Sequence, residues 1–268
     1  MSEAKEERVI TVVEIISIGE ELLIGKVVNT NASWLAREVT RLGGRVRRIT
    51  VIGDDVHEIA LAINEALSRK PNLIITTGGL GPTFDDKTME ALALALNRKL
   101  ELNSSAAEYI RCKCMELGVP LNNRRLKMAY VPEGCIVLKN EVGMAPGVII
   151  ERNGVRIVAL PGVPREMEFM FTKYVAKMIA GRKFSEAEVL VEDVFEADIA
   201  SIVEEVMKRL PQIYIKTHPG VSDRGPAIRI HIYGRCKMEV VEEAVKQLIS
   251  RLLNAGGRVK KVSFGEKP

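Results

Sequence analysis

A run of glycines followed by two adjacent aspartates is the part of this 268-residue chain whose residue types could do chemistry. Gly78, Gly79 and Gly81 fall within one short stretch. Glycine tolerates positive φ and has no Cβ, so a phosphate can approach the backbone closely and accept hydrogen bonds from its N–H groups. Asp85 and Asp86 would repel that phosphate unless a divalent cation stood between them. Hard oxygen ligands favour Mg²⁺ or Mn²⁺ in that position.

A buried strand and a helix must hold this loop between them. Residues 73–77 are apolar and β-branched, as in a parallel strand covered on both faces, and residues 89–96 have the apolar spacing of a helix face. The start of that helix would add unpaired N–H groups and a positive dipole end. An alternative is that Asp85, Asp86 and Thr88 merely cap the helix.

Other candidates follow other strands. The β-branched run 11–18 ends at Gly19 and Glu20, and ligands of α/β sheets bind beyond the carboxyl ends of parallel strands, so Glu20 is expected on the active side. Residues 160–167, Leu-Pro-Gly-Val-Pro-Arg-Glu-Met, also suit a plain strand-to-helix turn with Pro164 at the first helical position. The basic pair Arg124 and Arg125 is, by itself, equally well a solvated face.

Composition excludes several classes of protein. Hydrophobic residues make up 47% and charged residues 28% of the chain, as in an ordinary globular protein. The net charge of +4 is mild, so nucleic-acid binding is not expected. No apolar run approaches the length of a bilayer span, and the first eight residues are too charged for a signal peptide. We therefore expect a cytoplasmic protein without a membrane partner.

The order of the predicted elements indicates an α/β protein with two domains. The first is expected over residues 9–181, and a second, smaller α/β domain with the order β-α-β-β-α over 186–258. Any of Asn29 to Asn31 could cap a helix over 32–42. The most site-like part of the second domain is residues 216–220, where a predicted strand over 213–217 passes into a loop at His218 and Pro219, with a flexible continuation to Pro226.

The glycine stretch also carries a resemblance to a known family. Residues 76–90, which read T-T-G-G-L-G-P-T-x-D-D-x-T-x-E, resemble the signature of the amino-terminal domain of the competence/damage-inducible protein CinA family. That domain belongs to the molybdopterin-binding superfamily of MoaB, MogA and MoeA-like proteins. Those relatives usually carry Thr at the place of Leu80 and Arg at the place of Asp85, with Asp86 matching their essential acid. The departures favour CinA over molybdopterin adenylyl transfer.

The resemblance spans about residues 10–258 and implies a fold. That fold is the three-layer α/β/α MoaB/MogA-like fold, with a second, smaller α/β domain. An ordinary Rossmann-like domain is the alternative, but its G-x-G-x-x-G motif is missing. Bacterial CinA proteins continue into a nicotinamide-mononucleotide amidohydrolase domain. We expect a stand-alone form without it, so that activity is not transferred.

The function implied by the resemblance is that of a metal-dependent nucleotide pyrophosphatase that hydrolyses ADP-ribose or a similar nucleotide diphosphate, with Mg²⁺, Mn²⁺ or Co²⁺ as cofactor. The resemblance also implies a homodimer. Two alternatives stay open: a molybdopterin-binding or molybdopterin-adenylylating protein, and a non-catalytic nucleotide-binding module. Asp86, Asp85 and Glu20 would be catalytic, with Asp86 and Asp85 as metal ligands, and Lys87 would help to steady the leaving phosphate. The residues expected to bind the substrate and its phosphates are Thr77, Gly78, Gly79, Gly81, Thr88, Arg124, Arg125, Pro161, Gly162 and Pro164.

Overall fold

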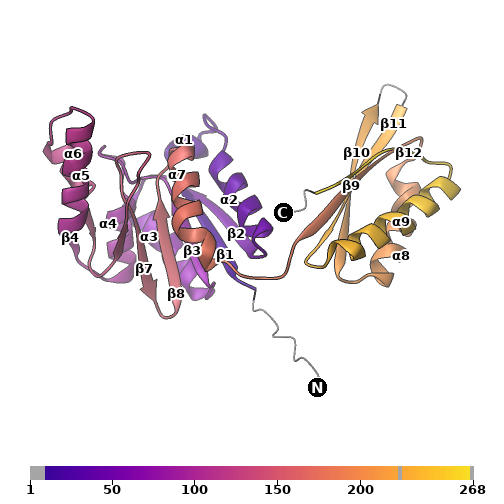
Figure 1. The fold of residues 1–268 in the computed structure, drawn as a ribbon, viewed down its shortest axis with the longest axis horizontal. Helices are drawn as coiled ribbons and strands as arrows, with labels where there is room; N and C mark the ends of the chain where they lie inside the picture. The colour runs from indigo at the N-terminus through magenta and orange to yellow at the C-terminus, as the bar shows by residue number, and fades with distance from the viewer. Residues whose placement is uncertain (1–9, 223–224, 266–268) are drawn as a thin grey trace, which may run out of the picture. The chain divides into compact units, whose positions relative to one another are not determined.

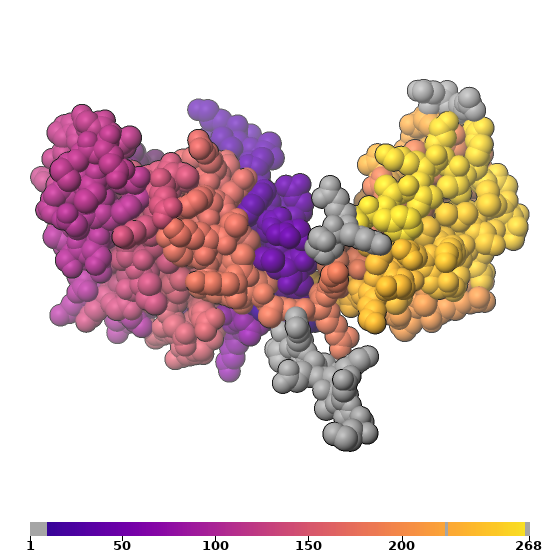
Figure 2. Space-filling model, in the orientation of Figure 1, coloured from indigo at the N-terminus to yellow at the C-terminus, as the bar shows by residue number. Residues whose placement is uncertain are grey.

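The computed structural model describes residues 10–222 and 225–265, and the chain divides into two compact units between Gly181 and Arg182 (Figure 1). In the space-filling view the first unit runs from indigo to salmon and the second from orange to yellow (Figure 2). The sequence placed the domain boundary in the same region, between residues 181 and 186. The predicted start of the first domain, residue 9, lies outside the described residues.

A six-stranded sheet forms the centre of the first unit. Its strand order is β2-β1-β3-β8-β7-β6, in which the first four strands are parallel and the last two run antiparallel to their neighbours. A two-stranded sheet of β4 and β5 accompanies it. The strands are β1 (Val12–Ile18), β2 (Arg45–Ile52), β3 (Leu73–Thr77), β4 (Leu100–Leu102), β5 (Tyr130–Pro132), β6 (Ile136–Leu138), β7 (Gly147–Arg152) and β8 (Val155–Leu160).

Helices cover both faces of this sheet, because alternate residues of its strands point to opposite sides. Ile15 and Ile75 pack with α2 and α7 on one face, whereas Ile16 and Ile74 pack with α3, α4 and α5 on the other. The helices are α1 (Glu20–Leu23), α2 (Thr30–Arg41), α3 (Val56–Ser68), α4 (Thr88–Leu96), α5 (Ser104–Glu116), α6 (Asn123–Lys127) and α7 (Pro164–Met170). The result is the predicted three-layer α/β/α arrangement.

Two local predictions around β8 had different outcomes. The Asn-Gly pair at residues 153–154 predicts a hairpin, and the structure confirms it, because both residues have positive φ, 50° and 79°, and join β7 to β8. The sequence also predicts a helix over 165–180. A regular helix there is wrong, because α7 passes into a π-helical turn, η1 (Phe171–Val175), and a 3-10 turn, η2 (Ala176–Met178). Phe171, in the π turn, is buried and meets the ring of Trp34 edge-on at 5.3 Å.

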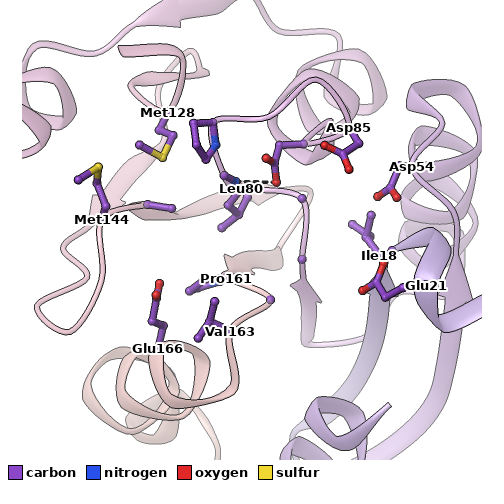
Figure 3. Close-up of a pocket in the computed structure, with 18 of the residues that line it drawn as sticks. Ile18, Glu21, Asp54, Leu80, Asp85, Met128, Met144, Pro161, Val163 and Glu166 are labelled. Atoms are coloured by element: carbon purple, nitrogen blue, oxygen red, sulfur yellow. Dashed lines mark hydrogen bonds between the residues drawn. The ribbon is translucent and has the colours of Figure 1, made fainter. Parts of the chain in front are cut away.

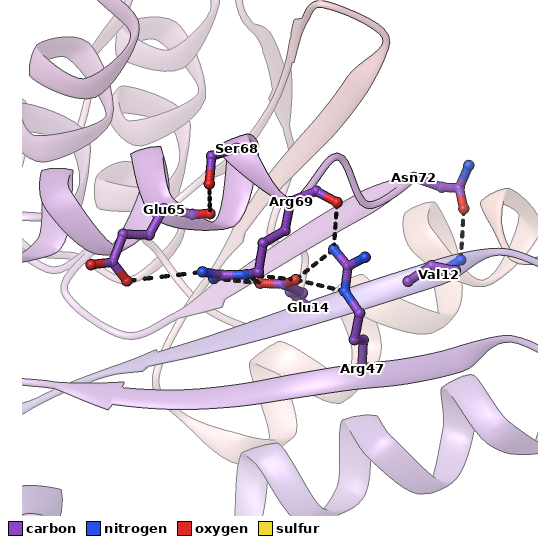
Figure 4. Close-up of polar contacts among 7 residues, drawn as sticks. All are labelled: Val12, Glu14, Arg47, Glu65, Ser68, Arg69 and Asn72. Atoms are coloured by element: carbon purple, nitrogen blue, oxygen red, sulfur yellow. Dashed lines mark hydrogen bonds and ion pairs between the residues drawn. The ribbon is translucent and has the colours of Figure 1, made fainter.

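A buried carboxylate joins the first two strands to the end of α3 (Figure 4). Glu14 of β1 accepts hydrogen bonds from Arg47 of β2, at 2.7 and 2.9 Å, and from Arg69, at 2.8 to 3.1 Å. Burial by itself would raise the pKa of Glu14, but hydrogen bonds from Arg69 and Arg47 and their charges hold that pKa below its ordinary value.

The second unit is a four-stranded antiparallel sheet with two helices on one face (Figure 1). The predicted strand over 213–217 is confirmed, but the loop predicted after it at His218 and Pro219 is wrong, because these residues continue β10 and pair with β11. Pro219 had suggested a loop, but β10 is an edge strand, where proline is tolerated. Part of the flexible continuation to Pro226, residues 223–224, lies outside the described residues. The elements are β9 (Ser185–Glu192), α8 (Glu196–Arg209), β10 (Ile213–Ser222), β11 (Gly225–Gly234), α9 (Met238–Asn254) and β12 (Arg258–Phe264).

The last strand, β12, extends beyond the predicted end of the second domain at residue 258. It pairs with β9 at the edge of the sheet. Its lysines are typical of an edge strand, but they give the segment the composition of a polar tail, so the strand was not predicted from the sequence. Among the described helices of both units, none combines the length and the apolar composition needed to cross a bilayer.

Candidate functional site

A cavity of about 440 Å³ lies at the carboxyl ends of the four parallel strands of the first unit (Figure 3). Ile18 is the last residue of β1, Asp54 follows β2, Gly78 follows β3 and Pro161 follows β8, and all four line the cavity. This edge of an open α/β sheet is where ligands usually bind. The glycine stretch singled out in the sequence is therefore one wall of this cavity.

Two glycines of this wall occupy positions that no other residue could fill. Gly78 has φ of 106°, and a Cβ there would lie 2.1 Å from the carbonyl oxygen of Ile18. Gly79 has φ of 66°, and a Cβ there would lie 2.3 Å from Oγ1 of Thr88. The Thr88 hydroxyl is buried and donates to the carbonyl of Gly78 at 2.7 Å. The first residue of α4 thus holds the loop against the end of β3.

Backbone N–H groups of the loop are available to a ligand. Within the described parts of the chain, no group accepts a hydrogen bond from the N–H of Gly79 or of Leu80. Both residues line the cavity. Unpaired backbone donors beside a cavity are suited to phosphate oxygens, as the glycine content of the sequence had suggested.

Asp86 organises the same loop. Its carboxylate accepts hydrogen bonds from the N–H groups of Gly81 and Thr83, both at 2.7 Å, and lies 2.5 Å from the hydroxyl oxygen of Thr83. From the outside, Lys127 donates to the carbonyls of Thr83 and Asp86, both at 2.8 Å. These bonds fix the path of residues 81–86.

The helix-cap interpretation of the two aspartates is wrong. Helix α4 begins at Thr88 with Lys87 at its N-cap, and no side chain caps it. The carboxylate of Asp86 is instead used by the preceding loop, and the hydroxyl of Thr88 points back to Gly78. Lys87 pairs with Glu90 of its own helix at 3.3 Å and does not line the cavity.

Asp85 remains exposed at the mouth of the cavity (Figure 3). The hydroxyl of Thr83 donates a hydrogen bond to its Oδ1, and that bond, more than any other contact, lowers the pKa of Asp85 below its ordinary value. A carboxylate with a lowered pKa carries its negative charge at neutral pH. Of the two aspartates, Asp85 has fewer bonds to the protein and more freedom to meet a ligand or its cation.

Three acids stand on one side of the lining, and two methionines together with the carboxylate of Glu166 stand on the other (Figure 3). In Figure 3, Asp85, Asp54 and Glu21 stand on one side of the glycine loop, whereas Met128 and Met144 stand on the other. Asp86 and Glu166 add two further carboxylates to the lining, and Arg125 supplies a guanidinium. The acids therefore outnumber the arginine five to one, so the cavity has a strongly negative charge.

Several predicted site residues lie next to the cavity rather than in its lining. Glu20 does not line it, because α1 begins at this residue and its carboxylate lies over Gly53, whereas Glu21 lines the cavity instead. Successive helical residues point about 100° apart, so a shift of one position decides this outcome. Arg124 is exposed outside the lining, and its neighbour Arg125 is the member of the basic pair that lines it.

The remaining predicted residues stand at or behind the walls. Pro161 and Gly162 line the cavity, as does Val163, but Pro164 starts α7 and does not. Thr77 is buried behind the wall, where its hydroxyl donates to the carbonyl of Pro161 at 2.9 Å. Its role is to join the end of β3 to the end of β8.

Asn29 and Asn31, which the sequence offered as alternative caps, have different roles. Asn29 caps α2 through a bond from the N–H of Ala32 at 3.1 Å. Asn31 instead donates from Nδ2 to Thr77 at 3.2 Å and to the carbonyl of Gly162 at 2.8 Å. It therefore holds two of the loops that form the cavity.

Other residues of the site were missed in the sequence. Glu166 lines the cavity and accepts a hydrogen bond from Asn140 at 2.5 Å, and Asn140 also donates to the carbonyl of Ala145 at 3.0 Å. Glu166 lies in the L-P-G-V-P-R-E-M run and could have been found there. Met128 and Met144 carried no signal, because methionine is common in any core.

The site does not by itself present a complete metal centre. Among the residues described, no group of three or more His, Cys, Asp or Glu side chains is arranged to hold a metal ion. The carboxylate of Asp86 already accepts two backbone hydrogen bonds. A hard cation takes six or more oxygen ligands, so one bound here would receive most of them from water or from a phosphate of the ligand.

Comparisons with known proteins agree with this fold and site. Residues 14–181 match the family model described as "Probable molybdopterin binding domain". A protein of Saccharolobus islandicus is 45% identical over 246 residues, which cover 90% of this chain and 93% of the relative, and a protein of Saccharolobus solfataricus is 46% identical over 243 residues, 89% and 88% of the two chains.

A solved structure resembles the first unit. The crystal structure of the protein CinA from Thermoplasma acidophilum, titled as having unknown function, matches with a TM-score of 0.59 and 39% identity over 63% of this chain and 99% of that one. The predicted MoaB/MogA-like fold with a smaller second domain is confirmed. The chain belongs to the molybdopterin-binding domain family, as a CinA-like member.

Proposed function

We propose that the cavity of the first unit binds a phosphorylated pterin, molybdopterin or its adenylylated form, together with a divalent cation. The observation that carries this proposal is the pair of unpaired N–H groups of Gly79 and Leu80 in the wall of a cavity in a molybdopterin-binding domain. Phosphate oxygens are the acceptors that such a wall fits best.

The methionine side of the cavity suits a flat ring. Met128 and Met144 stand there, and methionine sulfur makes favourable contacts with aromatic rings. A volume of about 440 Å³ lies within the range of small-molecule sites. A ring beside the methionines would leave its phosphate next to the glycine loop.

The charge of the cavity supports the cation. Five carboxylates against one guanidinium would repel a bare phosphate. Because the described residues offer no complete metal site, the cation would arrive as part of the ligand's phosphate complex and be stabilised by Asp85. Binding should therefore require Mg²⁺, Mn²⁺ or Co²⁺ and should be lost in EDTA.

A cavity-filling variant tests the location of binding. Val163 lines the cavity and is 54% exposed, so Val163→Trp fills space without disturbing the core. Ile136→Trp, at a 65% exposed position of β6 outside the lining, is the matched control. Binding of a pterin phosphate, followed by pterin fluorescence in the presence of MgCl₂, should be lost in the first variant and kept in the second. Equal binding by both variants would refute the assigned cavity.

Hydrolysis of a nucleotide diphosphate is a second candidate function. The observation that favours it is the exposed Asp85, which is held ionised beside the glycine loop. In this proposal the protein releases AMP and ribose phosphate from ADP-ribose, and Asp85 and Asp86 are placed near the diphosphate. Chromatographic detection of AMP with each of the three metals tests it. Absence of AMP with every metal, combined with retained pterin binding, would leave the binding function alone.

An adenylylating activity and the homodimer implied by the resemblance have separate tests. If the protein transfers AMP from ATP to a pterin phosphate, pyrophosphate is released only when both substrates are present. Sedimentation equilibrium measures whether the chain forms a dimer at micromolar concentration.

A further inference from the structure

The second unit has a sheet face that neither of its own helices covers. Val189, Ile215 and Ile230 point from β9, β10 and β11 into the core shared with α8 and α9. Side chains alternate along a strand, so the residues between them point to the opposite face. The cross-strand register identifies which residues stand together on this open face.

One end of the open face is aromatic. Tyr214 of β10 pairs with Tyr233 of β11, and their ring centroids are 5.5 Å apart. The ring of Tyr233 also lies 4.7 Å from His231 and 5.8 Å from Phe184. Tyr214, on the edge strand, is 52% exposed, a large fraction for an aromatic side chain in a sheet. The rings form a continuous surface of which one is open to solvent.

The next rows of the same face are basic. Lys216 pairs with His231, and two residues further His218 pairs with Arg229. Across β9, Leu190 connects Arg229 to Lys261 of β12, so one row crosses the whole sheet. Arg229 is 63% exposed. Residues two apart on a strand are about 7 Å apart, so Lys216 stands one row from the tyrosines, whereas Arg229 and Lys261 stand two rows, about 14 Å, from them.

Acidic residues on the central strand reduce the charge of the face without cancelling it. Glu186 contacts His231 at 2.8 Å and Glu188 lies 3.5 Å from Arg229. Three cations, Lys216, Arg229 and Lys261, stand against these two carboxylates, which leaves one positive charge before any histidine is protonated. Contacts with phosphates should therefore be few and sensitive to salt.

We infer that this open face binds single-stranded nucleic acid, with bases stacked on the aromatic end and phosphates beside the basic rows. A four-stranded antiparallel sheet that presents aromatic rings on its uncovered face is a known way to hold two or three unstacked bases. Stacking tolerates any base, so the recognition is of single strands rather than of one sequence. From the sequence we expected no nucleic-acid binding, because the net charge of the whole chain is mild. Net charge does not show where the cations lie, so it gave no sign of this basic row.

The experiment measures fluorescence anisotropy of labelled 12-nucleotide oligo-U, oligo-dT and a 12-base-pair duplex with the full chain. Single strands should bind in the micromolar range and the duplex more weakly. Loss of stacking is worth about 1–3 kcal/mol per base, so Tyr214→Ala should weaken binding by about 5- to 150-fold, whereas Tyr214→Phe should bind like the parent. Comparison of oligo-U with oligo-dT shows whether RNA or DNA is preferred.

Charge controls separate this surface from general attraction. Lys216→Ala should lower the salt dependence of binding by about 0.7 in slope, the value for one lost phosphate contact on a single strand. Lys208→Ala removes the same charge from an exposed position of α8, on the covered side of the sheet, and should change nothing.

Three outcomes would overturn the inference. One is no binding of either single strand at low salt, and another is equal losses in the Lys216 and Lys208 variants. The third is binding that Tyr214→Ala leaves intact while polyglutamate competes as well as oligo-U, because the face would then recognise an acidic protein rather than bases. None of these outcomes depends on the cavity of the first unit.

Discussion

Replacing Glu14 by glutamine should destabilise the first unit by about 2–3 kcal/mol. The Glu14 side chain is 2% exposed, and it is the only carboxylate in contact with both guanidinium groups among the described ion pairs. Removing one partner of a buried ion pair typically costs about 3–5 kcal/mol. Arg47 and Arg69 are 34% and 26% exposed, so water can solvate them in part, and the expected loss is smaller than that range.

The effect should depend on pH in a definite direction. The pKa of Glu14 is lowered in the folded protein, so its contribution to stability is fully present above the ordinary glutamate pKa of 4.5 and is lost as the pH falls through the lowered value. Glu14→Gln has no such titration. The difference in unfolding free energy between parent and variant should be constant from about pH 6 to about pH 8, well above the ordinary pKa of glutamate. It should become smaller as the pH falls below that pKa.

Urea unfolding followed by tryptophan fluorescence measures this difference. The chain has one tryptophan, Trp34, and it packs on the core of the first unit, so the signal reports that unit. Glu65→Gln is the control, because Glu65 is 58% exposed and 3.9 Å from Arg69, and such a pair is worth less than about 1 kcal/mol. The reasoning would be refuted if the Glu14 variant were as stable as the parent at neutral pH, or if their difference in unfolding free energy stayed the same at acidic pH.

Three further predictions concern the glycine loop. Thr88→Val should cost about 1–3 kcal/mol in the same urea assay, because the buried carbonyl of Gly78 loses its hydroxyl donor; an unchanged midpoint would contradict this. Gly78→Ala should cost more than about 3 kcal/mol or prevent folding, since the new Cβ would meet the carbonyl of Ile18, and soluble expression followed by circular dichroism measures it. Asp86→Asn should lower the affinity for a pterin phosphate about tenfold or more, since hydrogen bonds to a charged acceptor are worth about 1.5–3 kcal/mol. The midpoint of thermal unfolding should change little. A large fall in this midpoint with unchanged affinity would show that Asp86 stabilises the fold rather than the binding loop.

Much of the first unit could be predicted from the sequence because its signals are local. The apolar run 73–77, the glycines after it and the Asn153-Gly154 turn each specify their own structure. The position of the cavity followed from one further rule, that ligands meet the carboxyl ends of parallel strands. These signals need no knowledge of distant contacts.

What the sequence left open depends on side-chain direction and on long-range pairing. Glu20 and Glu21 are equally acidic, and only the start of α1 decides that Glu21 lines the cavity. Asp86 was expected to face a metal, but its immediate partners are the N–H groups of a loop whose path no propensity predicts. The strand β12 was missed because a charged edge strand has the same composition as a tail.

The crowding at Gly78 links three strand ends into one block. Its missing Cβ leaves room for the carbonyl of Ile18, and its Cα lies 3.3 Å from where a Cβ of Gly162 would stand. With no free space between them, the ends of β1, β3 and β8 can shift only together. Any adjustment to differently sized ligands must therefore come from the rim, where Glu21, Arg125 and Met144 are carried by short or irregular segments, so changes of specificity should arise there while the floor of the site keeps its shape.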